Sequence, residues 1–174
     1  GNELYYEDQV DNYKQNHFQI HWSQIYQNGW NSNFGIHFTN GKGFFENYNL
    51  GYGASDYIDR RWLDNDFYVA NLLFHHQKEK HELNIGAYYS SYVGLHFGSL
   101  VWATQANVNP KHRFYENTGK KKDGNIFAKW GYTISDQWNL YADAQLRWID
   151  YSVAGEVAGP EMFTVNDAHT FFNP

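Results

Sequence analysis

The chain has 174 residues, an aromatic content of 20% and a formal net charge of −6. Its mean hydropathy of −0.74 excludes a helical membrane protein, and no run approaches the roughly 18 apolar residues that a spanning helix needs. The acidic balance gives no indication of a nucleic-acid partner. The absence of cysteine excludes disulfides and thiolate metal sites. Aromatic residues favour strands, so the composition indicates an all-β chain.

Polar and apolar residues alternate in six segments after a polar stretch, residues 1–15, that we expect to be a loop. Such alternation puts the apolar side chains of a strand on one face. The clearest case is WNLYADAQLRW at 138–148, in which Trp138, Leu140, Ala142, Ala144, Leu146 and Trp148 share one parity. The pattern predicts strands at 16–26, 30–39, 66–76, 81–92, 124–133 and 138–148.

The links between these strands alternate between short and long. Asn28-Gly29 is a strong hairpin signal, and the links at 77–80 and 135–137 are also short. Long polar stretches, 40–62 and 93–122, are predicted as loops, and the basic cluster at 120–122 falls in the second. Short turns on one side and long loops on the other are typical of outer-membrane barrels, whose short turns face the periplasm.

The outward aromatic residues fall at two levels, which matches the preference of aromatic rings for both bilayer interfaces. Near the short turns lie Tyr26, Trp30, Phe74, Trp130, Tyr132 and Trp138; near the long links lie Phe18, Phe38, Tyr68, Tyr89 and Trp148. We therefore expect an antiparallel up-and-down meander of about six to eight strands that forms part of a transmembrane β-barrel. A soluble antiparallel sheet packed on a core is the alternative.

No catalytic, metal or cofactor site is predicted, and no ligand-binding residue can be named. His17 and His21 share a polar face but lie about 13 Å apart along one strand, too far to share a metal without other ligands. His75 and His76 point to opposite faces. Asp143 and Arg147 share the polar face of their strand, where they are expected to form a polar lining or an ion-pair network. We therefore expect a protein that is not an enzyme.

Several stretches, in collinear order over nearly the whole chain, resemble the barrel of TonB-dependent outer-membrane receptors, especially the Bacteroidetes-type branch. They are VDNYKQNH (10–17), FTNGKGFFE (38–46), RRWLDNDFY (60–68), HFGSLVWA (96–103) and the run from NIFAK to DAQLR (125–147). The terminal FFNP (171–174) resembles the start of the next strand of that family. Neither a plug domain nor the closing strands are found, so residues 1–174 are expected to be a single internal segment of a receptor barrel.

The resemblance implies energy-coupled uptake of a bulky solute such as an iron chelate, cobalamin, haem or a glycan. It implies an outer-membrane location, with the lipid bilayer, the solute and a TonB-type energy-coupling protein as partners. The Tyr- and Asn-rich stretches at 44–58 and 93–118 are expected to be loops that suit contact with a large ligand, and ordinary extracellular loops are the alternative. The alternative function is a soluble β-sandwich or barrel that binds a carbohydrate or another ligand without catalysis.

An isolated segment of such a barrel exposes an apolar face and two strand edges, and both favour association. We expect it to curl or pair into a small closed barrel or sandwich. The stripe residues would then be buried: Ile20, Trp22, Phe34, Ile36, Leu72, Ile85, Trp130, Leu140 and Leu146.

Overall fold

The computed structural model shows an all-β chain, and it describes residues 6–51, 56–104, 109, 112–157 and 163–173. Seven strands form a single sheet. Their bounds are β1 Asp11–Ile25, β2 Trp30–Asn49, β3 Tyr57–Lys78, β4 His81–Ala103, β5 Arg113–Ser135, β6 Trp138–Val157 and β7 Phe163–Asn173. The described part of the chain has no helix that is long and apolar enough to cross a membrane.

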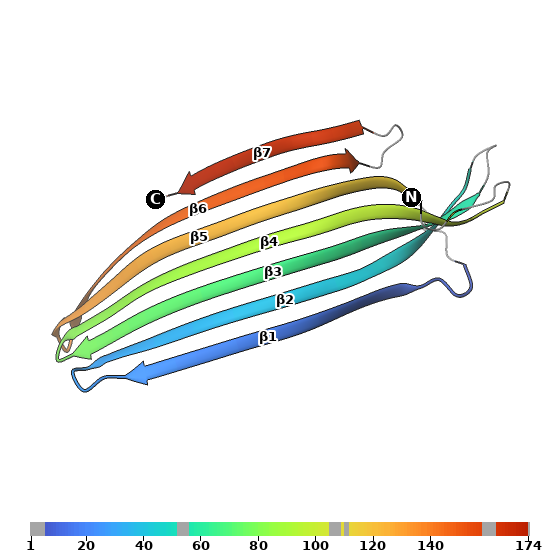
Figure 1. Cartoon of the computed structure of the whole chain (residues 1–174). Helices are drawn as coiled ribbons and strands as arrows, with labels where there is room; N and C mark the ends of the chain where they lie inside the picture. Colours follow the sequence, from blue (N-terminus) through green and yellow to red (C-terminus); the bar gives the residue numbers. More distant parts are fainter. Residues whose placement is uncertain (1–5, 52–55, 105–108, 110–111, 158–162, 174) are drawn as a thin grey trace.

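Each strand pairs antiparallel with its neighbour in the sequence, so the sheet order is β1-β2-β3-β4-β5-β6-β7 (Figure 1). The short links, residues 26–29, 79–80 and 136–137, all lie at one end of the sheet, and the links that alternate with them along the chain are longer. At the first turn Gly29 has a φ of 82°, a conformation that glycine adopts without strain. The prediction of an antiparallel meander with alternating link lengths is confirmed.

The strands are much longer than predicted, and most of the predicted loops are wrong. The stretches 40–49, 57–62 and 93–103 continue β2, β3 and β4, while the basic cluster 120–122 lies inside β5. β1 already begins at Asp11, and Phe171 and Phe172 end β7 rather than begin a strand. In these extensions the polar residues occupy both faces of the strand. The alternation of apolar residues therefore stops before the backbone pairing of the strands does.

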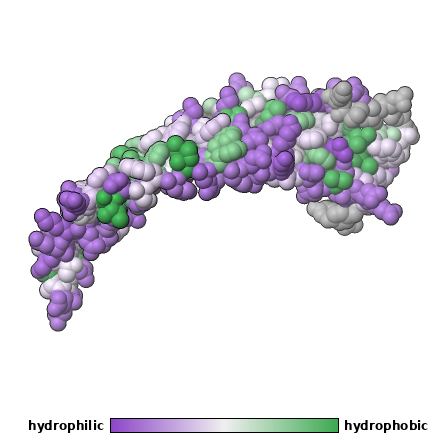
Figure 2. All heavy atoms as spheres, turned by 60° about the horizontal axis from the view of Figure 1, so that its bottom comes forward, coloured by the Kyte–Doolittle hydropathy of each residue, from purple (hydrophilic) through white to green (hydrophobic). Residues whose placement is uncertain are grey.

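The expected closure into a small barrel or sandwich is also wrong. β1 and β7 do not pair with each other, and Figure 2 shows an arched slab built from one sheet. Ile20, Trp22 and Leu140 remain 65%, 52% and 48% exposed, and Ile36, Ile85 and Leu146 are exposed as well. Phe34, Leu72 and Trp130 are half-buried by neighbours in the sheet. Each strand pairs only with its sequence neighbours, so the described residues provide no second layer to cover the stripe.

The sheet has almost no hydrophobic core. Among the described residues, Phe97 and Tyr115 are the only buried hydrophobic side chains. Backbone ladder bonds and contacts between side chains on neighbouring strands therefore supply most of the order, at roughly 0.2–1 kcal/mol for each favourable cross-strand pair. Buried polar residues outnumber apolar ones and lie mainly on the face opposite the stripe: Thr39, Asp59, Asn65, Ser90 and Asp123.

Close packing between β1 and β2 requires a glycine at position 43. Gly43 pairs with Tyr13, and a Cβ at position 43 would lie 2.5 Å from the Tyr13 Cα and also against the Asn12 carbonyl oxygen. A backbone contact of this kind cannot be relieved by rotating a side chain. Gly119, in β5, has no atom within 4 Å of an added Cβ.

We expect Gly43→Ala to destabilise the chain by about 1–3 kcal/mol, because β1 must shift away from β2. Gly119→Ala is the matched control, and it should be neutral or stabilise the chain by up to about 1 kcal/mol, since alanine loses less backbone entropy than glycine. Urea denaturation of both variants measures the difference. Equal effects at the two positions would contradict the close approach of β1 and β2.

Candidate functional site on the two faces of the sheet

One face of the sheet carries a continuous apolar belt. The strand register places apolar residues of six neighbouring strands side by side, for example along the row Trp22, Phe34, Leu72, Ala87, Ile126 and Leu146. Most of the large side chains in this belt are exposed. We define the belt by the alternate residues, on the same face as this row, within 18–22, 34–38, 68–74, 83–89, 124–132 and 138–148. An exposed apolar surface of this extent marks an interaction site with protein or lipid.

Aromatic side chains border the belt at both levels that the sequence predicted. On the side of the long links, the ring centroids of Phe18 and Phe38 lie 6.1 Å apart, and those of Phe38 and Tyr68 lie 4.6 Å apart. On the side of the short turns, Trp130 stacks on Tyr132 at 6.0 Å. Aromatic pairs across strands stabilise the sheet and also suit the border between an apolar and a polar phase.

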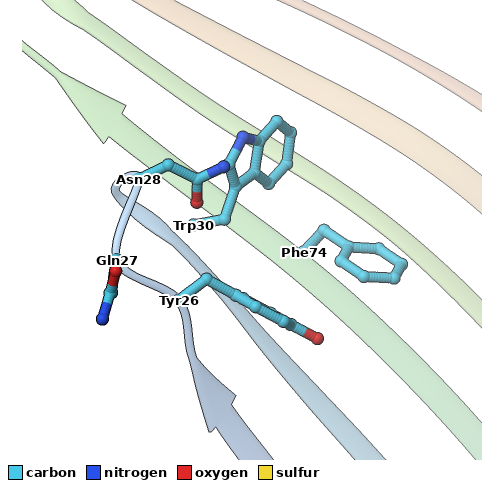
Figure 3. A pocket seen from close by; sticks show the side chains of 5 residues that line it. All are labelled: Tyr26, Gln27, Asn28, Trp30 and Phe74. Atoms are coloured by element: carbon cyan, nitrogen blue, oxygen red, sulfur yellow. The ribbon is translucent and has the colours of Figure 1, made fainter.

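The border at the short turns contains an open aromatic notch of about 630 Å³ (Figure 3). It is lined by Trp30 from β2, Phe74 from β3 and three residues of the first turn, Tyr26, Gln27 and Asn28. The Tyr26 hydroxyl is 3.2 Å from the Ser32 hydroxyl. The notch therefore offers apolar ring faces with polar groups at the edge, as an interfacial position requires.

The opposite face of the sheet is polar and carries a groove of about 550 Å³ beyond the level of the belt. Side chains from β1 to β5 line it, among them Asp11, Tyr13, Phe45, Arg61, His96 and Tyr115. The groove combines phenol, imidazole and guanidinium groups with apolar rings. Such a surface can stack on and hydrogen-bond a polar ligand.

Buried partners hold the polar groups of this groove in place. Arg61 Nε donates to Asp59 Oδ2 at 3.1 Å, and the Asp59 carboxylate is buried. The Tyr13 hydroxyl donates to Asn65 Oδ1 at 2.7 Å. Burial lowers the pKa of His96 and so favours the neutral imidazole. None of these residues was predicted as a site, because only the pairing of the strand extensions brings them together.

A second polar cluster lies between β5 and β6. Arg147 binds the Asp123 carboxylate with two hydrogen bonds, of 3.0 and 2.6 Å, and Lys121 Nζ lies 3.8 Å from the same carboxylate. Asp143 does not join this cluster; it accepts a hydrogen bond from the Tyr141 hydroxyl. Asp143 and Arg147 thus belong to the polar lining without an ion pair between them, and the partner of Arg147 comes from the neighbouring strand.

Histidines on the polar face pair across strands. His17 Nδ1 lies 3.5 Å from His37 Nε2, and both nitrogens contact the Thr39 hydroxyl. His75 faces Asn84 and His76 stacks on Trp30, so these two histidines do point to opposite faces. In the described part of the chain, no three His, Cys, Asp or Glu side chains are gathered so that they could hold a metal ion.

On the face that carries the belt, but beyond its border, a charged cluster attaches the segment before β1 to β2 and β3. The Glu46 carboxylate accepts hydrogen bonds from Arg60 Nε at 2.7 Å, from the Val10 N–H at 3.1 Å and from the Tyr6 hydroxyl. Burial acts to raise the pKa of Glu46, but these three donors hold it below its ordinary value. Burial, together with the hydrogen bond to Glu46, raises the pKa of Tyr6 to about 12.

No protein-family model matches this sequence, and no match among curated proteins was found. The resemblance to TonB-dependent receptors therefore remains a prediction.

The Glu46 cluster predicts a pH dependence of stability. Because the folded-state pKa of Glu46 is lowered, its contribution is present above the unfolded-state pKa and is lost as the pH falls through the folded-state value. At pH 6, Glu46→Gln should cost about 1–3 kcal/mol, since Arg60 loses its charged partner. The difference between wild type and variant should shrink as the pH falls toward 3, measured by urea denaturation at each pH.

Glu116→Gln is the control for this measurement. Glu116 also pairs with an arginine, Arg113, but both side chains are half-exposed, whereas Glu46 is buried. Its loss should cost less than about 1 kcal/mol. A Glu46→Gln effect that stays constant from pH 6 to pH 3 would show that Glu46 is not held as a carboxylate.

The two-bond pair between Arg147 and Asp123 gives a second prediction. Asp123→Ala should destabilise the chain by about 1 kcal/mol, less than the roughly 1.5–3 kcal/mol of charged hydrogen bonds, because solvent screens the half-exposed Arg147. Asp143→Ala should change the stability by less than about 0.5 kcal/mol. An equal loss in both variants, measured by chemical denaturation, would contradict the assignment of Asp123 as the partner of Arg147.

Proposed function

We propose that this sheet is a sector of an outer-membrane β-barrel that belongs to a TonB-dependent receptor and takes up a bulky solute. The observation that carries the proposal is the exposed apolar belt between two aromatic borders, with a polar face behind it. This is the arrangement of lipid-facing and lumen-facing residues in a transmembrane barrel. The family resemblance adds the expectation of energy-coupled uptake of an iron chelate, cobalamin, haem or a glycan.

The height of the belt supports a membrane-spanning role. From Trp138 to Trp148 the belt on β6 spans ten residue steps, which is about 33 Å along a strand at ~3.3 Å per residue. For a strand tilted by about 40°, this length corresponds to ~25 Å along the membrane normal. That value agrees with the apolar band of outer-membrane barrels, which is ≈ 25 Å tall.

The belt also runs obliquely across the strands. In β1, β2 and β3 its upper border is the row Phe18, Phe38 and Tyr68. The same row continues into β4, β5 and β6 as the polar residues Ser91, Lys122 and Asp150. In these three strands the upper border of the belt therefore lies closer to the short turns. The lower border is displaced toward the short turns as well. Strands that cross an apolar band at an angle are expected for tilted staves of a barrel.

The two open edges fit a sector better than a complete domain. β1 and β7 each have a partner on one side only, and most of β1 is exposed to solvent. Unpaired backbone groups are not tolerated in the hydrocarbon region of a membrane. We therefore propose that further strands of the same barrel pair with β1 and β7, and that the lumen lies on the polar face.

In this proposal the strand extensions form a wall outside the bilayer, and the solute meets the polar groove there. Tyr13, Arg61 and His96 face the lumen side of that wall. They replace the predicted loops as the candidate ligand-contacting surface. Rigid strands position side chains more accurately than loops do.

A charge placed at the centre of the belt tests the lipid-facing assignment. Ala144 lies in the middle of the belt, where it pairs with Ala128, and Gln145 is the next residue on the polar face. Ala144→Arg should weaken binding of the chain to phosphatidylcholine vesicles by about 2–4 kcal/mol, whereas Gln145→Arg should change it little. Vesicle flotation after dilution from urea measures the bound fraction. Equal effects of the two variants would refute the assignment.

Uptake itself is tested in the cell that encodes this chain. An in-frame deletion of the segment should abolish energy-dependent uptake of one solute among labelled iron chelates, cobalamin, haem and oligosaccharides. Restoring the segment should restore that uptake, and replacing Arg61 with alanine should reduce it. If the purified chain binds vesicles as predicted but the deletion leaves the uptake of all four solute classes unchanged, the transport proposal is refuted and the barrel proposal stands.

A further inference from the structure

We propose that His17 and His37 form a binding site for a divalent transition-metal ion on the polar face. The two histidines belong to β1 and β2, and the imidazole nitrogens that face each other are 3.5 Å apart. Two nitrogens bound to one tetrahedral zinc ion at 2.0–2.1 Å are separated by about 3.4 Å. The pair therefore already has the separation that one ion requires.

The register of the sheet creates this pair. His17 lies directly opposite Thr39, and His37 lies directly opposite Gln19. The histidines are thus diagonal neighbours on one face, a distance that long side chains bridge readily. Their spacing along single strands gives no sign of a site, which is why the sequence predicted no metal: His17 was compared with His21 on its own strand.

Gln19 supplies a further feature of a metal-binding histidine. Its side-chain amide nitrogen, Nε2, lies 2.8 Å from His37 Nδ1. The amide oxygen and nitrogen can exchange places by a flip, so the amide oxygen can accept the Nδ1–H. With the proton on Nδ1, the Nε2 lone pair of His37 points toward His17. Metal-ligating histidines usually donate their other ring N–H in this way.

The residues around the histidine pair indicate which metal ions the site would bind and what their remaining ligands are. Thr39 is buried, and its hydroxyl lies 2.9 Å from His17 Nδ1 and 2.5 Å from His37 Nε2, so one hydroxyl contacts both nitrogens. His17 and Gln19 are exposed, which leaves the other coordination positions to water. Neutral imidazole ligands favour Zn²⁺, Cu²⁺ and Ni²⁺ over Mg²⁺ and Ca²⁺. A site with two protein ligands and open positions binds such an ion reversibly.

Metal titration of the 174-residue chain tests this site independently of any transport. Zn²⁺ affinity is measured by calorimetry for wild type, His17→Gln, His37→Gln and the matched control His21→Gln, which lies on the same strand face as His17. Loss of an outer hydrogen-bond partner typically costs roughly 10–100-fold in metal affinity. Loss of either His17 or His37 should therefore weaken Zn²⁺ binding at least about 10-fold, while His21→Gln and wild type bind alike.

Two further measurements separate a metal site from a simple hydrogen bond between histidines. Gln19→Ala should weaken Zn²⁺ binding about 10-fold, and Gln15→Ala, on the same face of β1, should leave it unchanged. Electron paramagnetic resonance of bound Cu²⁺ should show coupling to two imidazole nitrogens in wild type and one in His17→Gln. Far-UV circular dichroism confirms that each variant keeps its strands. Equal Zn²⁺ affinity of wild type, His17→Gln and His37→Gln would overturn the proposal.

Discussion

The register of the antiparallel strands is the constraint on which the rest of this structure depends. Side chains alternate between the two faces, so a slip of one residue between any two strands would move apolar residues onto the polar face. The observed register places Ile20 opposite Ile36 and Ile36 opposite Ala70, and it continues in this way to β6. The apolar belt, its aromatic borders, the polar groove and the histidine pair all follow from this one alignment.

The same alignment explains how the sheet is held together with so little core. Neighbouring strands satisfy the backbone, and polar side chains on the crowded face find partners across strands, as in the pairs of Asp59 with Arg61 and Asp123 with Arg147. No buried side-chain nitrogen or oxygen among the described residues lacks a hydrogen-bond partner. The apolar belt is not covered by a second layer among the described residues, and this imbalance between the faces supports the membrane proposal.

The function we propose uses the two faces for different purposes. In this proposal the belt would set the position of the sheet in a bilayer, and the polar face would present the groups that meet a solute. The groove around Tyr13 and Arg61 lies beyond the belt, while His17 and His37 lie behind the aromatic border formed by Phe18 and Phe38. A solute entering from the side of the long links would pass the groove before it reached the histidine pair.

The sequence by itself determined the strand character, the two faces, the aromatic levels and the alternation of short and long links. These features depend on local alternation and on turn residues such as Asn28-Gly29, which act over a few positions. It could not determine how far the strands continue, because residues 93–103 carry no simple alternation and are ordered by pairing with β3 and β5. Nor could it determine that the sheet stays open. The partners of Arg147, Tyr13 and His17 were decided only by the tertiary structure, since each lies on a neighbouring or more distant strand and depends on the register between strands.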